Sequence, residues 1–188
     1  MNKTIPMYHE GSRQLQDHFA TRPFADLLAE KLARDAFTDE DRAFIESRPL
    51  FFLATADANG QPDCSYKGGL PGFVRVVDAR TLAFPSYEGN GMFKSLGNVI
   101  VNPQVGMLFI DFQSPRRLRV TGRASMHQDD PLLAQFANAQ VIVRVQASAI
   151  FPNCPRYIHK MQLVERPTYA PRTGHASANP QCKTFPEF

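Results

Sequence analysis

A chain of 188 residues with a formal net charge of +3 is long enough to bury a sizeable core as one domain with an extension, and it is only mildly basic. Its 21 lysines and arginines are spread along the sequence, which excludes the dense basic run typical of nucleic-acid binders. No apolar stretch approaches the ~20 residues of a membrane span, and three cysteines without metal-ligand spacing indicate a soluble cytoplasmic protein with reduced thiols.

Residues 1–48 are expected to form a helical extension that packs on the domain after it. The apolar residues after Pro23 recur at the spacing of one helix face: Phe24, Leu27, Leu28 and Leu32. Thr38 and Asp41 have the spacing of a capping box at the start of another helix. His9 and His18 have no partner at a metal-ligand spacing, so we interpret both as surface or packing residues.

From residue 49 the sequence changes to short apolar or alternating runs separated by short turns. The expected strands are residues 50–56, 64–67, 73–77, 81–84, 105–112, 117–126 and 141–149. Several short strands joined by hairpin-type turns predict an antiparallel barrel or sandwich. Residues 141–145 are apolar apart from Arg144, so we expect both faces of that strand to be covered, in part by a partner subunit.

Residues 90–98 carry the clearest sign of a binding site. Gly89 and Gly91 free the backbone for a turn that opens into a short helix. Lys94 and Ser95 then fall in the first helical turn, beside free N–H groups and the positive end of the helix dipole. Such a combination binds anions, most often phosphate. The alternative is an ordinary turn and helix cap with a solvated lysine.

The end of the chain has a different composition. Cys154 lies close to Arg156 and His159, and basic neighbours lower the pKa of a thiol, which raises a nucleophile hypothesis. No activating pair stands at a suitable spacing, so the sequence does not favour catalysis by this cysteine. Residues 166–188 have little to bury and predict a loose tail or an arm laid on a partner subunit.

A series of motifs occurs in order between residues 45 and 165. They are the hairpin of residues 52–62, Ser65-Tyr66-Lys67-Gly68-Gly69, Phe84-Pro85-Ser86-Tyr87, Lys94-Ser95-Leu96-Gly97-Asn98, Asn102-Pro103 and residues 117–124. Together they resemble the FMN-binding split barrels of the pyridoxamine 5'-phosphate oxidase-like family, and within it a subgroup of flavin-nucleotide-binding proteins.

The resemblance implies a mainly β fold: a six-stranded antiparallel split barrel over residues 49–165, with the N-terminal helical extension and the C-terminal tail outside it. It also implies a homodimer with FMN at the subunit interface. The implied cofactor-binding residues are Ser65, Tyr66, Lys67, Pro85, Ser86, Tyr87, Asn90, Lys94, Ser95, Arg117 and Arg156. Lys94 and Ser95 match a basic pair that holds the phosphate, and Lys67 is expected to supply the charge that the serine lacks.

The chain departs from the vitamin-producing oxidases of that family, because it has no tryptophan and ends in a Pro-rich tail. Their substrate is therefore not expected here. We expect an FMN-dependent oxidoreductase acting on an unidentified small molecule, with no metal, nucleic-acid or membrane partner. The alternatives are a flavin carrier without its own substrate, or the same barrel holding haem or a deazaflavin. Only His127 and His159 would offer a haem ligand.

Overall fold

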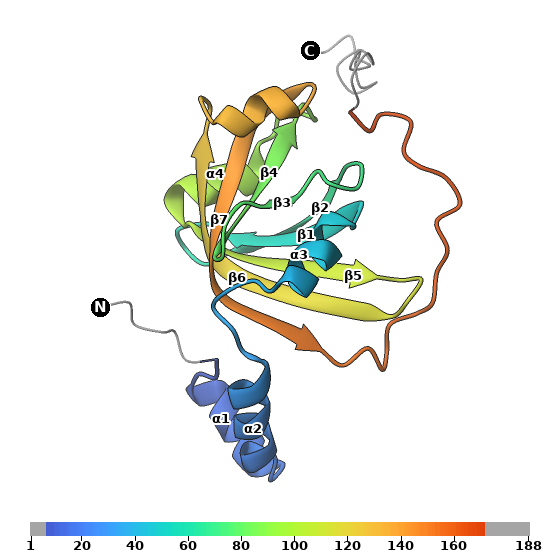
Figure 1. The fold of residues 1–188 in the computed structure, drawn as a ribbon. Coiled ribbons are helices and arrows are strands. Elements are labelled where there is room, and N and C mark those ends of the chain that lie inside the picture. The colour runs from blue at the N-terminus through green and yellow to red at the C-terminus, as the bar shows by residue number, and fades with distance from the viewer. Residues whose placement is uncertain (1–6, 172–188) are drawn as a thin grey trace.

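The computed structural model describes residues 7–171, and a curved antiparallel sheet of seven strands forms its centre (Figure 1). The strands are β1 (Leu50–Ala56), β2 (Pro62–Gly68), β3 (Arg75–Val76), β4 (Thr81–Tyr87), β5 (Gln104–Asp111), β6 (Arg116–His127) and β7 (Ala139–Asn153). Their order in the sheet is β2-β1-β5-β6-β7-β4-β3, and every neighbouring pair is antiparallel. The mainly β antiparallel fold is confirmed, and the two-residue strand β3 brings the strand number to seven rather than six.

The core lies inside the curve of this sheet. Alternate residues of β1 point inward, as the two-residue period of a strand requires, and Phe51 is fully buried. Its ring contacts those of Phe73, Phe84 and Phe109, with centroids 5.0–5.8 Å apart. Aromatic side chains from separate strands and a loop therefore meet at one point in the core.

The apolar run at residues 141–145 lies in the middle of β7. Ile142 and Val145 are fully buried, although the structure contains one chain. Strands β4 and β6 pair on either side of β7, and the 3-10 helix η1 (Pro131–Gln135) contacts it. The expectation that both faces are covered is confirmed, but the cover comes from the same chain and does not require a partner subunit.

The N-terminal helices divide into two groups (Figure 1). Helix α3 (Asp39–Glu46) lies on the barrel and buries Phe44 and Ile45 in its core. Helices α1 (Glu10–His18) and α2 (Arg22–Leu32) form a hairpin that projects from the barrel. Only α3 packs as expected of the extension, so the domain boundary at residue 48 stays a prediction.

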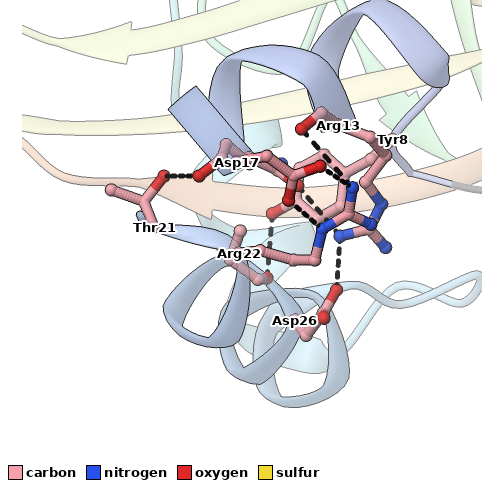
Figure 2. A network of polar contacts seen from close by, with 8 residues as sticks. Tyr8, Arg13, Asp17, Thr21, Arg22 and Asp26 are labelled. Atoms are coloured by element: carbon pink, nitrogen blue, oxygen red, sulfur yellow. Dashed lines mark hydrogen bonds and ion pairs between the residues drawn. The ribbon is translucent and has the colours of Figure 1, made fainter. Parts of the chain in front are cut away.

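Polar contacts hold the α1–α2 hairpin together (Figure 2). Arg13 pairs with Asp26, Arg22 pairs with Asp17, and the Tyr8 hydroxyl donates to the carbonyl oxygen of Ala25 at 3.1 Å. Four large apolar side chains of this region stay exposed: Leu15, Phe19, Phe24 and Leu27. The helix face predicted from the spacing of residues 24–32 is therefore only partly covered.

Thr38 and Asp41 form the predicted capping box at the start of α3. Asp41 N–H donates to Thr38 Oγ1 at 3.1 Å, and Thr38 N–H donates to Asp41 Oδ2 at 3.0 Å. We expect Thr38→Ala to lower the free energy of unfolding by about 1 kcal/mol in urea titrations. Thr21→Ala is the matched control, because Thr21 is the N-cap of α2 but its side chain makes no capping bond. Equal losses in both variants would contradict this account of the cap.

The described chain beyond β7 crosses the surface without forming a helix or strand. Residues 154–171 are turns and irregular backbone, and Met161 N–H donates to the carbonyl oxygen of Phe112 at 2.9 Å. Most of the predicted tail, with Cys182, lies outside the described residues. Within residues 7–171, no helix is long and apolar enough to cross a membrane, and no group of three His, Cys, Asp or Glu side chains could hold a metal ion.

Candidate functional site

A pocket of about 400 Å³ opens between β2, the end of β4 and the start of helix α4 (Lys94–Val101). A smaller hollow of about 140 Å³ shares Lys67, Ser86, Tyr87 and Leu96 with it. We call these the main pocket and the side hollow. The main pocket has the size usual for a small-molecule site. One end is polar, and the side hollow adds the rings of Phe73 and Phe84 to its lining.

The structure brings most of the predicted site residues to these two spaces. The main pocket is lined by Ser65, Lys67, Ser86, Tyr87, Asn90, Lys94 and Ser95. The side hollow adds Tyr66 and Pro85. Arg117 and Arg156 line neither space: Arg117 lies near the start of β6, opposite Ile110 and Asn153, and Arg156 follows the end of β7. Within one chain, these two arginines are not part of the pocket.

The loop before α4 leaves the start of the helix open. Phe93 occupies the N-cap in the left-handed region, with φ of 48°, and makes no side-chain cap bond. Gly91, with φ of 77°, supplies the positive φ that the preceding turn needs. Lys94 and Ser95 are the first two residues of the helix, where they were expected. With no capping side chain at this helix start, its first N–H groups can bind an anionic ligand.

Asp63 joins the polar end of the main pocket, and the sequence did not predict it. Ser95 Oγ lies 2.9 Å from Ser65 Oγ and 3.2 Å from Asp63 Oδ2, to which it donates. Lys94 Nζ lies 3.7 Å from Asp63 Oδ1. Asp63, Ser65 and Lys67 alternate along β2 and share a face, so the two-residue period of the strand could have identified Asp63.

Burial changes the ionisation of two residues in the pocket. Lys67 is half-buried, and this burial lowers its pKa below the ordinary 10.5, while the charge of Asp63 opposes the shift. Burial raises the pKa of Tyr87 above 10.0, so that its hydroxyl stays neutral and can donate a hydrogen bond. The pocket therefore offers a cation of reduced hydration at Lys67 and a neutral donor at Tyr87.

Two predicted site residues direct their side chains elsewhere. Tyr66 is 58% exposed, and its ring meets Phe52 edge-on at 6.1 Å, on the other face of β2 from Ser65 and Lys67. The Asn90 amide bonds within its own loop, accepting from Met92 N–H at 3.1 Å and donating to Met92 Sδ at 3.2 Å. Tyr66 and Asn90 therefore contribute to the shape of the site more than to ligand contacts.

The residues of the two other sequence hypotheses lie outside the pocket. Cys154 is exposed and lines neither the main pocket nor the side hollow. The ring of His127 bonds to Ser125 Oγ at 2.9 Å, and none of the residues lining the two spaces is a histidine. Nothing in the described residues therefore supports a thiol nucleophile or a histidine ligand in the pocket.

Comparisons with known proteins agree with the fold and with the motif order. The family model described as pyridoxamine 5'-phosphate oxidase matches residues 37–166, which is more than half of the chain. No curated protein matches the sequence.

Among solved structures, a protein from Lactobacillus delbrueckii, provisionally named as a pyridoxamine 5'-phosphate oxidase, is 24% identical. The match covers 63% of this chain and 95% of that one, with a TM-score of 0.51. HupZ of Group A Streptococcus is 18% identical over 62% of this chain and 94% of its own, with a TM-score of 0.50. At these identities, the likeness shows a shared fold.

Proposed function

The chain belongs to the pyridoxamine 5'-phosphate oxidase family, and we propose that it binds FMN in the main pocket and uses it as an oxidoreductase acting on a small organic molecule. The observation that carries this proposal is the open start of α4, with Lys94 and Ser95 at the polar end of a pocket of suitable size. Bound FMN would supply hydride or electron transfer, while the protein supplies binding and orientation.

The residues around the pocket fit a flavin phosphate in charge and in donor type. The Lys94 ammonium, the Ser95 hydroxyl and the first N–H groups of α4 would bind the phosphate oxygens. Lys67 would add a second positive charge from β2. The two lysines face the carboxylate of Asp63 at this end, and Glu88, which follows β4, also lines the pocket. The two ammonium groups suit a phosphate ester of charge about −1.5 to −2.

The other side of the pocket suits the flavin ring. Pro85, Ser86 and Tyr87 at the end of β4 would border it, with the neutral Tyr87 hydroxyl as a hydrogen-bond donor. The side hollow places apolar rings next to these residues. Asp63 and Glu88 are the carboxylates that line the main pocket, and Lys94 and Ser95 engage Asp63, so we assign no proton donor.

We further propose a homodimer in which the flavin site is shared between subunits. Arg117 and Arg156, assigned to the flavin by their place in the motif order, lie away from the pocket of their own chain. In a two-fold dimer each could reach the flavin in the partner's pocket, and the two sites would be equivalent.

The test of the cofactor assignment is the visible spectrum of the purified protein, followed by titration of the apoprotein with FMN, riboflavin, a deazaflavin nucleotide and haemin. We expect a flavin spectrum and tighter binding of FMN than of riboflavin, because only FMN carries the phosphate. A Soret band in the purified protein, or haemin binding that excludes FMN, would contradict the flavin assignment.

A flavin carrier without its own substrate is the second candidate, because no residue of the pocket is assigned as a proton donor. Anaerobic mixing with NADH or NADPH separates the two functions. Bleaching of the flavin band within about 0.1 s, the time of a median turnover, supports a reductase. If chemical reductants bleach the flavin but NADH and NADPH do not, the result favours the carrier or a different electron donor.

The lowered pKa of Lys67 predicts that FMN affinity falls at alkaline pH. Below its pKa, Lys67 is an ammonium that attracts the phosphate, and this attraction is lost as the pH rises through that value. We expect up to about a tenfold loss per pH unit above the pKa. Lys67→Arg, which stays charged, should abolish this loss.

The measurement is the FMN dissociation constant from pH 7 to pH 10, in wild type and in Lys67→Arg. Riboflavin is titrated in parallel, because it shares the ionisation of the flavin ring but lacks the phosphate. The ratio of affinities at high and neutral pH is compared, so that a constant effect of the substitution cancels. An equal loss of FMN affinity at alkaline pH in wild type and in Lys67→Arg would show that Lys67 is not the source of the loss.

A further inference from the structure

Asp63 is an anion at the place where the proposed function puts the phosphate. Its side chain is 17% exposed, its Oδ2 accepts from Ser95 Oγ at 3.2 Å, and its Oδ1 lies 3.7 Å from Lys94 Nζ. Ser95 is itself buried and also lies within 2.9 Å of Ser65 Oγ. One carboxylate thus engages both residues that open α4, the hydroxyl and the ammonium that a phosphate would need.

The charge of Asp63 also opposes an anionic ligand directly. Two negative groups sharing Lys94 and Ser95 would repel each other, and this repulsion is appreciable at separations of a few Å near a protein surface. A phosphate can bind there only if it displaces the carboxylate from Lys94 and Ser95 or stays beside it at a cost. In both cases the favourable binding free energy of the phosphate is reduced, either by the lost contacts of Asp63 or by the repulsion between the two anions.

We propose that Asp63 is an internal competitor for the phosphate group, which lowers the affinity of the site for FMN and keeps the bound flavin exchangeable. This inference rests on the proposed function and deepens it. A site with this residue suits a flavin that exchanges with free FMN, either as a dissociable cofactor of the oxidoreductase or as the ligand of a carrier. The ligand class is a phosphate monoester of a flavin, and the residue acts on its phosphate end alone.

The test is Asp63→Asn, which removes the charge but keeps an oxygen that can accept from Ser95. We expect the FMN dissociation constant to fall about tenfold, with a slower dissociation rate carrying most of the change. Riboflavin binding should change less than twofold, because riboflavin has no phosphate. Glu10→Gln is the matched control: it makes the same change of charge at an exposed position of α1, on the hairpin that projects from the barrel (Figure 1).

An FMN dissociation constant that is unchanged or raised in Asp63→Asn would overturn the inference, and so would an equal gain for riboflavin. These outcomes leave the proposed function intact, because wild type still binds FMN. Inorganic phosphate, followed by the broadening of its 31P resonance, gives a readout without flavin. If no flavin binds either protein, the proposed function fails. Stronger phosphate binding by Asp63→Asn would then still support the competitor role, and equal binding would overturn it.

Discussion

Replacing Lys94 with alanine is expected to weaken FMN binding by about ten- to a hundredfold. The ammonium lies at the open start of α4, and a charge-assisted contact with a phosphate contributes about 1.5–3 kcal/mol. The substitution also leaves Asp63 without its cationic partner, so that the carboxylate opposes the phosphate more strongly. Titration of FMN by quenching of flavin fluorescence measures the change.

Three controls separate the phosphate contact from a general loss of the site. Riboflavin should bind wild type and Lys94→Ala almost equally, because it lacks the phosphate. Lys31→Ala removes an exposed lysine of α2 and should leave FMN binding unchanged. The double variant Lys94→Ala, Asp63→Asn should lose less than Lys94→Ala alone, since neighbouring charges couple. Equal losses of FMN and riboflavin in Lys94→Ala would contradict a phosphate contact at this residue.

The position of helix α4 could be predicted from the sequence because local signals determine it. Glycines before residue 92 and a proline at 103 limit where α4 can lie, and the helix runs from Lys94 to Val101. Strand β1 was predicted at its observed ends, because an apolar β-rich run stands directly before the turn at Asp57. In such places the backbone preference and the burial pattern agree.

Strand β7 shows why other boundaries could not be predicted. The run Phe151-Pro152-Asn153 is typical of a turn, yet it continues the strand to Asn153. Strand β4 pairs with β7 only as far as Gln146, and beyond that point β6 is the strand that pairs with it. A proline is tolerated where one side of a strand needs no N–H donor. Whether a neighbour is present depends on the tertiary fold, which local sequence does not specify.

The role of Asp63 depends on tertiary structure in the same way. Asp63 on β2 contacts Lys94 and Ser95 on α4, although Asp63 and Ser95 are 32 positions apart in the sequence. The motif order identified Lys94 and Ser95 as candidate site residues, but not the anion beside them. The projecting α1–α2 hairpin is a further case, because its helices were predicted but their position relative to the barrel was not.

We expect substitutions on the surface of α4 to have the largest effect on dimer formation. Ile100 and Val101 at the end of this helix are 72% and 58% exposed, and Met92 and Phe93 before it are 70% and 56% exposed. Large apolar side chains gathered around one helix are typical of an interface. Because Met92 and Phe93 also line the main pocket, a partner docked here would stand next to the proposed flavin site.

We therefore expect a homodimer of twice the 21.1 kDa of one chain, with α4 at its interface, and we expect FMN to stabilise it. A ligand that contacts both subunits stabilises the dimer by about 2.7 kcal/mol when it is present at a hundredfold excess over its dissociation constant. Ile100→Asp should cost about 2 kcal/mol or more of association free energy, which raises the dimer dissociation constant roughly thirtyfold. Sedimentation at low protein concentration, with and without FMN, measures both effects.

Leu15→Asp is the matched control for Ile100→Asp, because Leu15 is 62% exposed but lies on α1 in the projecting hairpin. If Leu15→Asp dissociates the dimer and Ile100→Asp does not, the interface lies on the hairpin and not beside the pocket. A monomer that keeps FMN fully bound would show that the site is complete in one chain. In that case Arg117 and Arg156 would have no role at the flavin, because neither lines the pocket of its own subunit.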